Sequence, residues 1–146
     1  MPKLFVQKSI EINASASKIW EVLTNSEMAK KWIKEFWTDF GSLESDWKLR
    51  SPVLWKVSNG KIGAEGNVSI AEPYTMLQFS FKVNDTPVFK QEDLNYKIED
   101  LDGRSVLVVS MGDFGDTPEH EMCYSGAVES WDKALPKIKE LAELEL

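Results

Sequence analysis

The single histidine of the chain, His120, stands four residues before Tyr124. Residues four apart on a helix lie on one face, so an imidazole and a phenol would point the same way. Such a pair can orient a polar group of a ligand, and an imidazole can also act as a general acid or base. No second histidine and no nucleophile motif accompanies them, so catalysis by His120 is the weaker interpretation.

Three other groups could do chemistry, and each has a simpler explanation. Cys123 is the only cysteine, and we interpret it as a half-buried structural thiol. Asp113 and Asp116 could act as an acid–base pair, but a turn and a helix N-cap explain them. The segment from Gly63 to Gly66 lacks the spacing of a phosphate loop and predicts a bend in a sheet. One histidine and one cysteine are too few for a structural zinc site, so we predict no metal and no cofactor.

A long helix at the end of the chain must position His120 and Tyr124. Thr117, Pro118 and Glu119 are typical of a helix start: an N-cap residue, a proline at the first position and an acid in the first turn. The segment that follows predicts a helix of about 25 residues, in which Pro136 indicates a kink. One narrow stripe of this helix carries His120, Tyr124, Ala127, Trp131, Leu135, Ile138 and Ala142.

The middle of the chain alternates between apolar and polar residues, which is typical of strands with one buried and one solvent-exposed face. The alternation covers residues 62–70, 77–83 and 94–98, and the segment 105–111 is more uniformly apolar. Asn59-Gly60 and Asp102-Gly103 predict two-residue hairpin turns. Proline has no backbone N–H to donate to a neighbouring strand, so Pro52 marks a strand end, an edge strand or a bulge. These signals together predict an antiparallel sheet.

Two short helices are predicted between the leading strand and this sheet. Ser15 or Ser17 can cap the first, and the sequence Thr24-Asn25-Ser26-Glu27 reads as a capping box for the second. The long terminal helix must bury its apolar stripe, and the sheet is the only large apolar surface available. We therefore predict an α+β domain in which a curved antiparallel sheet wraps one long helix.

The bulk composition excludes several classes of protein. A chain of 146 residues with 42% hydrophobic residues fits a single globular domain over residues 1–146. No apolar run approaches the ~20 residues of a membrane-spanning helix, and the start lacks the apolar core of a signal peptide, so we expect a cytoplasmic protein without membrane insertion. With a net charge of −7 and no Lys/Arg cluster, we expect no nucleic-acid partner. The acid excess lies in residues 74–146, which we interpret as a solvated surface.

The order of elements and three segments resemble the helix-grip superfamily, known as START-like or SRPBCC. The segments are SIEINASASKIWEVLTNSEMAKKWI, GAEGNVSIAEPYTMLQFSF and SWDKALPKIKELAE. The superfamily includes steroidogenic-acute-regulatory-related lipid transfer domains, birch-pollen-allergen-like proteins and polyketide cyclases. This chain is most similar to the branch named for the C-terminal domain of the activator of the heat-shock protein 90 ATPase. Ser130 departs from that branch, which more often has glycine before the tryptophan. The larger side chain of serine would leave less space between the helix and the sheet.

The resemblance implies a helix-grip fold of about six or seven strands, with an internal cavity between the sheet and the C-terminal helix. The two short helices would plug one end of the curved sheet, and Trp20 and Trp32 would pack inside that plug. We expect a ligand to contact large side chains that face the cavity, although core packing explains each ring about equally well. The candidates are Trp37, Trp47, Trp55, Phe79, Phe81, Tyr96, Met111, His120, Tyr124 and Trp131.

The function that these features favour is binding of a hydrophobic small molecule that is lipid-like, aromatic or polyketide-like. The superfamily also hosts enzymes and co-chaperones, so the resemblance is weak evidence for activity. One alternative is an enzyme of cyclase or dehydratase type that uses His120 and Tyr124. The other is a chaperone co-factor or a stress-response interaction module that uses the acidic surface to bind a protein partner.

Overall fold

The fold is described here from a computed structural model, for residues 5–83, 92–112, 114 and 118–144. The side chains of residues 119 and 120 also lie outside the description. The elements in chain order are β1 (Val6–Ile12), α1 (Ala16–Thr24), α2 (Ser26–Ile33), β2 (Phe40–Glu44), β3 (Pro52–Val57), β4 (Ile62–Glu72), β5 (Met76–Val83), β6 (Glu92–Asp100), β7 (Ser105–Gly112) and α3 (Pro118–Glu143).

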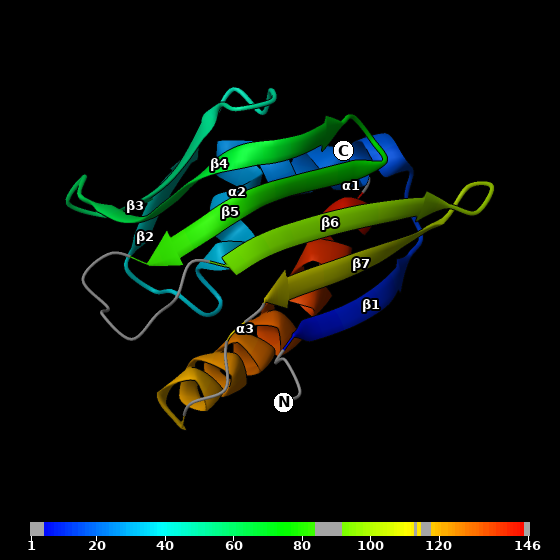
Figure 1. Cartoon of the computed structure of the whole chain (residues 1–146). Coiled ribbons are helices and arrows are strands. Elements are labelled where there is room, and N and C mark those ends of the chain that lie inside the picture. The colour runs from blue at the N-terminus through cyan, green and yellow to red at the C-terminus, as the bar shows by residue number, and fades with distance from the viewer. Residues whose placement is uncertain (1–4, 84–91, 113, 115–117, 145–146) are drawn as a thin grey trace.

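The seven strands form one antiparallel sheet in the order β1-β7-β6-β5-β4-β3-β2. The first strand pairs with the last, so β1 lies at the edge beside β7. Figure 1 shows the sheet curving around the helices, with all three helices on its inner side. This arrangement confirms the predicted α+β helix-grip fold.

Two hairpin turns were predicted from Asn-Gly and Asp-Gly pairs, and only one has the predicted length. Asp102 and Gly103 both have positive φ (60° and 97°), and Leu101 N donates to the carbonyl of Arg104 at 2.7 Å, as a two-residue turn requires. Between β3 and β4 the prediction is wrong. Gly60 has positive φ there and Asn59 does not. Val57 N donates to the carbonyl of Lys61 at 2.9 Å, so three residues lie between this pair and only the last of them, Gly60, is left-handed.

The short helices begin at polar caps. The hydroxyl of Ser15 accepts from Lys18 N at 3.3 Å and caps α1, and Asn25 Oδ1 accepts from Met28 N at 3.1 Å and caps α2. The predicted capping box beginning at Thr24 is wrong, because Thr24 still belongs to α1 and its hydroxyl donates to the carbonyl of Trp20. The predicted cap Thr117 and the pair Asp113 and Asp116 lie outside the described residues.

The two helix tryptophans have different environments. Trp32 is 0% exposed, its Nε1 donates to the carbonyl of Val22 at 2.9 Å, and its ring centroid lies 5.9 Å from that of Trp131 on α3. Trp20 is half-buried and meets the ring of Tyr74 edge-on. Trp32 therefore ties the plug formed by α1 and α2 to the long helix, whereas Trp20 lies nearer the surface.

The C-terminal half of α3 is fastened to β1 and the loop after it. Lys139 Nζ donates to the carbonyl of Glu11 at 3.1 Å and to the carboxylate of Glu143, which also accepts from Asn13 N at 2.8 Å. These hydrogen bonds lower the pKa of Glu143 below its usual value. Farther toward the N-terminal end of the helix, Lys8 pairs with Asp132 at 2.6 Å. The helix is thus held firmly at one edge of the sheet.

Candidate functional site

A cavity of about 320 Å³ lies between the inner face of the sheet and the N-terminal half of α3. Among the described residues, its wall is apolar except for one thiol and one hydroxyl. It consists of Phe36 and Trp37 after α2, Trp55 on β3, Phe81 and Val83 on β5, Leu94 on β6, Met111 on β7, and Cys123, Gly126, Ala127, Ser130 and Trp131 on α3.

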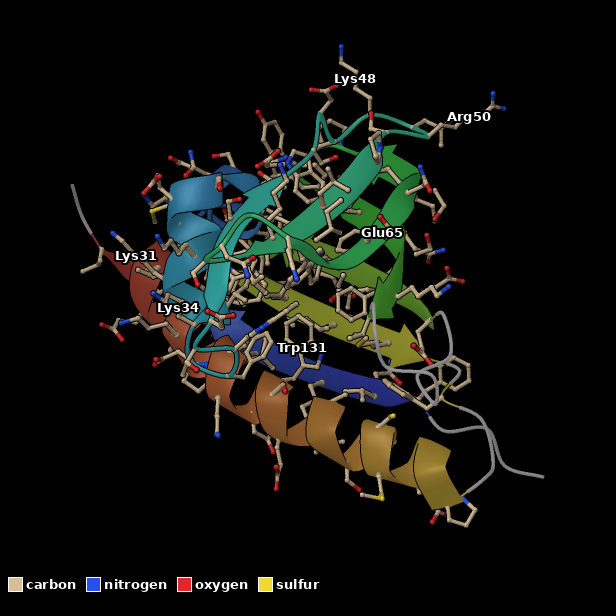
Figure 2. All side chains as sticks on the ribbon, turned by 90° about the vertical axis from the view of Figure 1, so that its left-hand side faces the viewer. Lys31, Lys34, Lys48, Arg50, Glu65 and Trp131 are labelled. Carbon is tan, nitrogen blue, oxygen red and sulfur yellow. The ribbon has the colours of Figure 1, made fainter. Side chains whose placement is uncertain are left out.

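Aromatic rings form one side of this wall. Trp37 and Trp55 are stacked with centroids 6.2 Å apart and planes 16° apart, and Phe81 meets Trp55 edge-on at 5.1 Å. Trp131 closes another side from α3, and Figure 2 shows it rising from the helix toward the sheet. Such packed rings have little conformational freedom left to lose when a ligand binds.

The helical side of the wall is lined by small residues. A Cβ atom added to Gly126 would meet no atom within 4 Å, so this position leaves open space. Ser130 donates its hydroxyl to the carbonyl of Gly126 at 2.9 Å and so directs its polar group along its own helix. The helix therefore bounds the cavity without filling it.

The thiol on the cavity wall is affected by a buried carboxylate at the start of β6. Cys123 is half-buried on the wall, and Glu92 is 2% exposed. Burial raises the pKa of the Cys123 thiol, and the negative charge of Glu92 raises this pKa further. The thiolate is the nucleophilic form, so this environment suppresses the reactivity of Cys123.

A first prediction concerns this thiol. We expect iodoacetamide to modify Cys123 more slowly near pH 8 than it modifies a free cysteine, because a raised pKa leaves less thiolate. Glu92→Gln removes a charge that raises the pKa, so it should shift the pH–rate profile toward lower pH. Asp93→Asn removes the same charge from the exposed, outer face of β6 and should leave the profile in place. Equal profiles for the wild type and Glu92→Gln would contradict the assignment.

The predicted ligand contacts separate into groups in the structure. Trp37, Trp55, Phe81, Met111 and Trp131 come together on the cavity wall. Trp47, Phe79, Tyr96 and Tyr124 do not line it, and the side chain of His120 lies outside the described part. A direct contact of any of these residues with a ligand stays a prediction.

The four described residues that lie off the wall pack against other rings. The ring of Phe79 lies between Trp47 at 5.8 Å and Tyr96 at 6.0 Å, and the indole of Trp47 donates to the carbonyl of Thr24 at 3.1 Å. Through Trp47, these three rings contact the end of α1. Burial strongly raises the pKa of the Tyr96 phenol. Tyr124 meets Phe114 edge-on.

Seven wall residues were not among the predicted contacts: Phe36, Val83, Leu94, Cys123, Gly126, Ala127 and Ser130. Val83 and Leu94 belong to the inward-facing sets of alternating residues on their strands, and Ala127 belongs to the apolar stripe of the helix. The periodicity of the sequence therefore pointed to these three residues. Gly126 and Ser130 had none beyond their small size beside Trp131.

A second prediction compares two buried indoles. Trp32 Nε1 has an acceptor in Val22, whereas Trp55 Nε1 is buried with no acceptor in the described part of the chain. Trp32→Phe should therefore destabilise the protein by about 1–3 kcal/mol more than Trp55→Phe, because only the first leaves a carbonyl without its donor. Urea unfolding of both variants measures the difference. An equal loss of stability would contradict the importance assigned to the bond from Trp32 to Val22.

The described residues contain no cluster of three or more side chains suited to a metal ion. Within the same ranges, no helix has the length and apolar character needed to cross a membrane.

The sequence model of one family, described as Activator of Hsp90 ATPase homolog 1-like protein, matches residues 13–143. The chain belongs to this family. Its membership confirms the predicted branch of the helix-grip superfamily. No curated protein sequence matches the chain.

Solved structures share the fold of this Activator of Hsp90 ATPase homolog 1-like chain at low sequence identity. A Mesorhizobium loti protein has 16% identity and a TM-score of 0.80, covering 97% of this chain and 99% of its own. The Aha1 dimer from Colwellia psychrerythraea has 18% identity and a TM-score of 0.74, with 96% of both chains covered. A protein from Cytophaga hutchinsonii has 22% identity and a TM-score of 0.72, with 98% and 97% covered.

Proposed function

We propose that this protein binds a small apolar molecule in the cavity between the sheet and α3. The observation that carries the proposal is the cavity itself: about 320 Å³ lined by five aromatic side chains and by small residues on the helix. Sites for small molecules are concave and mostly apolar, and typically have volumes of about 300–1,000 Å³. A volume at the lower end of that range favours a ligand with one or two rings, or a short chain, over an entire lipid.

A fluorescence titration with the neutral probe phenylnaphthylamine tests this proposal. We expect saturable binding with a blue-shifted emission, because the probe leaves water for a ring-lined cavity. Gly126→Leu places a side chain in the open space on the wall and should weaken binding by about tenfold or more, which corresponds to at least 1.4 kcal/mol. The control Ser125→Leu adds the same side chain at the adjacent position, which is exposed like Gly126 but does not line the cavity. Absence of saturable binding, or equal affinity in both variants, would overturn the proposal.

A protein partner is a second candidate, because the name of the family refers to the activation of another protein. The feature that favours it is the loop before β3, where Leu49 is 60% exposed between Lys48 and Arg50. Trp47 and Arg50 have positive φ of 56° and 72°, and Figure 2 shows Lys48 and Arg50 extending away from the body. Residues held in such sparsely populated backbone conformations cluster at binding and active sites.

This second candidate predicts an acidic partner. Its binding should weaken at high salt, and Lys48→Glu with Arg50→Glu should abolish it. The control Lys31→Glu with Lys34→Glu makes the same charge change at α2 and its C-cap, which lie elsewhere on the surface in Figure 2. Binding that is insensitive to salt, or that is lost equally in both double variants, would count against this loop.

The enzymatic alternative depends on His120 and Tyr124. Tyr124 is half-buried against Phe114 and does not line the cavity. An activity screen with cyclisation and dehydration substrates tests this alternative, and turnover that survives His120→Ala would remove the only general base assigned to it.

A further inference from the structure

The sheet has two edge strands, and they are protected to different degrees. On β2, which packs against α2, Leu43 N donates to the hydroxyl of Ser26 at 3.3 Å, and the register shifts between Phe40 and Ser42. A covering helix and a bulge are devices that stop an edge strand from pairing with another chain. The other edge strand, β1, pairs with β7 along its whole length without a shift, and Figure 1 shows it at the rim of the sheet.

The backbone of β1 is open in the first half of the strand. Lys139 Nζ on α3 donates to the carbonyl of Glu11 at 3.1 Å, so this carbonyl points away from β7 and its end of the strand is closed. Successive residues of an antiparallel strand direct their backbone groups to alternate sides, so the N–H and C=O groups of Gln7 and Ser9 also point outward. Within the described ranges, no hydrogen bond reaches these outward groups.

A shallow groove of about 410 Å³ lies beside this open part of β1. It is lined by Gln7, Lys8, Ser9 and Ile10 of β1 and by Trp131, Asp132, Leu135 and Pro136 of α3. The four β1 residues are consecutive, so the groove follows the backbone edge of the strand and not one of its faces. Pro136 has no N–H, so it cannot donate the helical hydrogen bond that the carbonyl of Asp132 would normally accept. Both walls therefore present backbone groups without their usual partners.

An extended peptide has the backbone that matches this edge. On each side of such a peptide, N–H and C=O groups recur every second residue, roughly 6.4–6.8 Å apart, as they do at Gln7 and Ser9. Addition of a peptide strand to an exposed sheet edge is a recurring mode of recognition. Alternate side chains of the peptide would face the groove, where Leu135 and Pro136 are apolar and where Lys8 and Asp132 already neutralise each other at 2.6 Å.

A second copy of β1 is a poorer occupant of this edge. Two paired copies would bring two Lys8 side chains onto the same face of the sheet, and like charges on neighbouring strands oppose pairing. A foreign segment with uncharged, apolar residues at these positions avoids the repulsion.

We infer that the open part of β1, residues 7–9, binds an extended segment of a partner protein by strand addition, with an apolar side chain at every second position facing the groove. The inference goes beyond the proposed function and does not depend on it, because the groove shares only Trp131 with the cavity.

A displayed library of random nine-residue peptides, selected against the wild-type protein, tests the inference. We expect the tightest binders to have apolar residues at alternate positions. Ser9→Pro removes the outward N–H and keeps the strand's bonds to β7, as proline at a strand edge can, whereas the control Ser9→Thr keeps this N–H. Affinity for the selected peptides should fall by about tenfold or more in Ser9→Pro and stay at the wild-type value in Ser9→Thr. Failure to select any peptide, or equal affinity in both variants, overturns the inference.

Methylation of the peptide backbone separates strand addition from binding by side chains alone. N-methyl groups on every second residue block one edge of an extended peptide and leave the other edge free. We expect one of the two possible methylation patterns to abolish binding and the other to retain it. An equal effect of both patterns overturns the inference.

Hydrogen exchange of the wild type covers the case in which Ser9→Pro does not fold. In the free protein, the amides of Gln7 and Ser9 should exchange faster than those of Lys8 and Ile10, which face β7, and a selected peptide should slow the exchange of Gln7 and Ser9. Unchanged exchange at a saturating peptide concentration overturns the inference. Slow exchange of Gln7 and Ser9 in a dimer of the free protein also overturns it, in favour of self-pairing. Each of these results leaves the proposed function standing, because that function is judged by phenylnaphthylamine binding.

Discussion

Gly66→Ala is expected to destabilise the protein by about 3 kcal/mol or more, at the upper end of the cost of overpacking. A Cβ atom at this position would lie 1.6 Å from the carbonyl oxygen of Ser80 and 2.4 Å from its carbonyl carbon. Both atoms belong to the backbone of β5, so no rotation of a side chain relieves the clash. Strands β4 and β5 must therefore separate at Gly66, two residues before the shift in their register between Val68 and Ile70.

Urea unfolding followed by tryptophan fluorescence measures this effect, and Gly126→Ala is the matched control. Position 126 has open space around the added methyl group and lies inside α3. Alanine there should therefore stabilise the protein by about 0.5–1 kcal/mol through helix propensity. If Gly66→Ala had the same urea midpoint of unfolding as the wild type, the close approach of β4 and β5 would be contradicted.

Trp131→Ala should cost about 3–5 kcal/mol, the usual range for removing a large buried aromatic residue. The indole is 4% exposed and connects three parts of the fold. Its ring centroid lies 5.9 Å from that of Trp32 in the plug and 6.0 Å from that of Tyr96 in the sheet. Its loss would also enlarge the cavity, since the ring forms part of the wall.

Trp20→Ala is the control for Trp131→Ala, because Trp20 is half-buried and packs edge-on against the exposed Tyr74. Its replacement should cost clearly less. Thermal and urea unfolding rank the two variants, and phenylnaphthylamine affinity should change in Trp131→Ala alone. A larger loss of stability in Trp20→Ala would contradict the role assigned to Trp131 as the link between helix, plug and sheet.

The architecture could be predicted because periodicity alone identifies its elements. Alternation along residues 77–83 and 94–98 corresponds to β5 and β6, and the long helix follows from its stripe and from Pro118 at its first position. Local details were less predictable. Asn59-Gly60 is compatible with loops of two or three residues, and Thr24 and Asn25 can each cap a helix. Tertiary context decides between these options.

The cavity could be predicted only in part, because alternation gives the face of a residue but not its position along the curved sheet. Phe79 and Phe81 have the same phase on β5, yet Phe81 lines the cavity while Phe79 packs against Trp47. The helices α1 and α2 fill one end of the curved sheet, and their extent determines which of the two rings faces the cavity. Glycines are equally ambiguous in sequence: Gly66 permits close contact between strands, whereas Gly126 leaves space empty.

Amide NMR during a titration with phenylnaphthylamine tests the cavity most directly, because it reports where the probe sits. We expect saturable shifts that are largest for wall residues from separate elements, such as Leu94, Met111, Cys123 and Ala127, and negligible for the exposed loop 48–50. Shifts confined to surface residues, or an unchanged spectrum at saturating probe, would contradict the claim that this protein holds an apolar molecule between its sheet and its long helix.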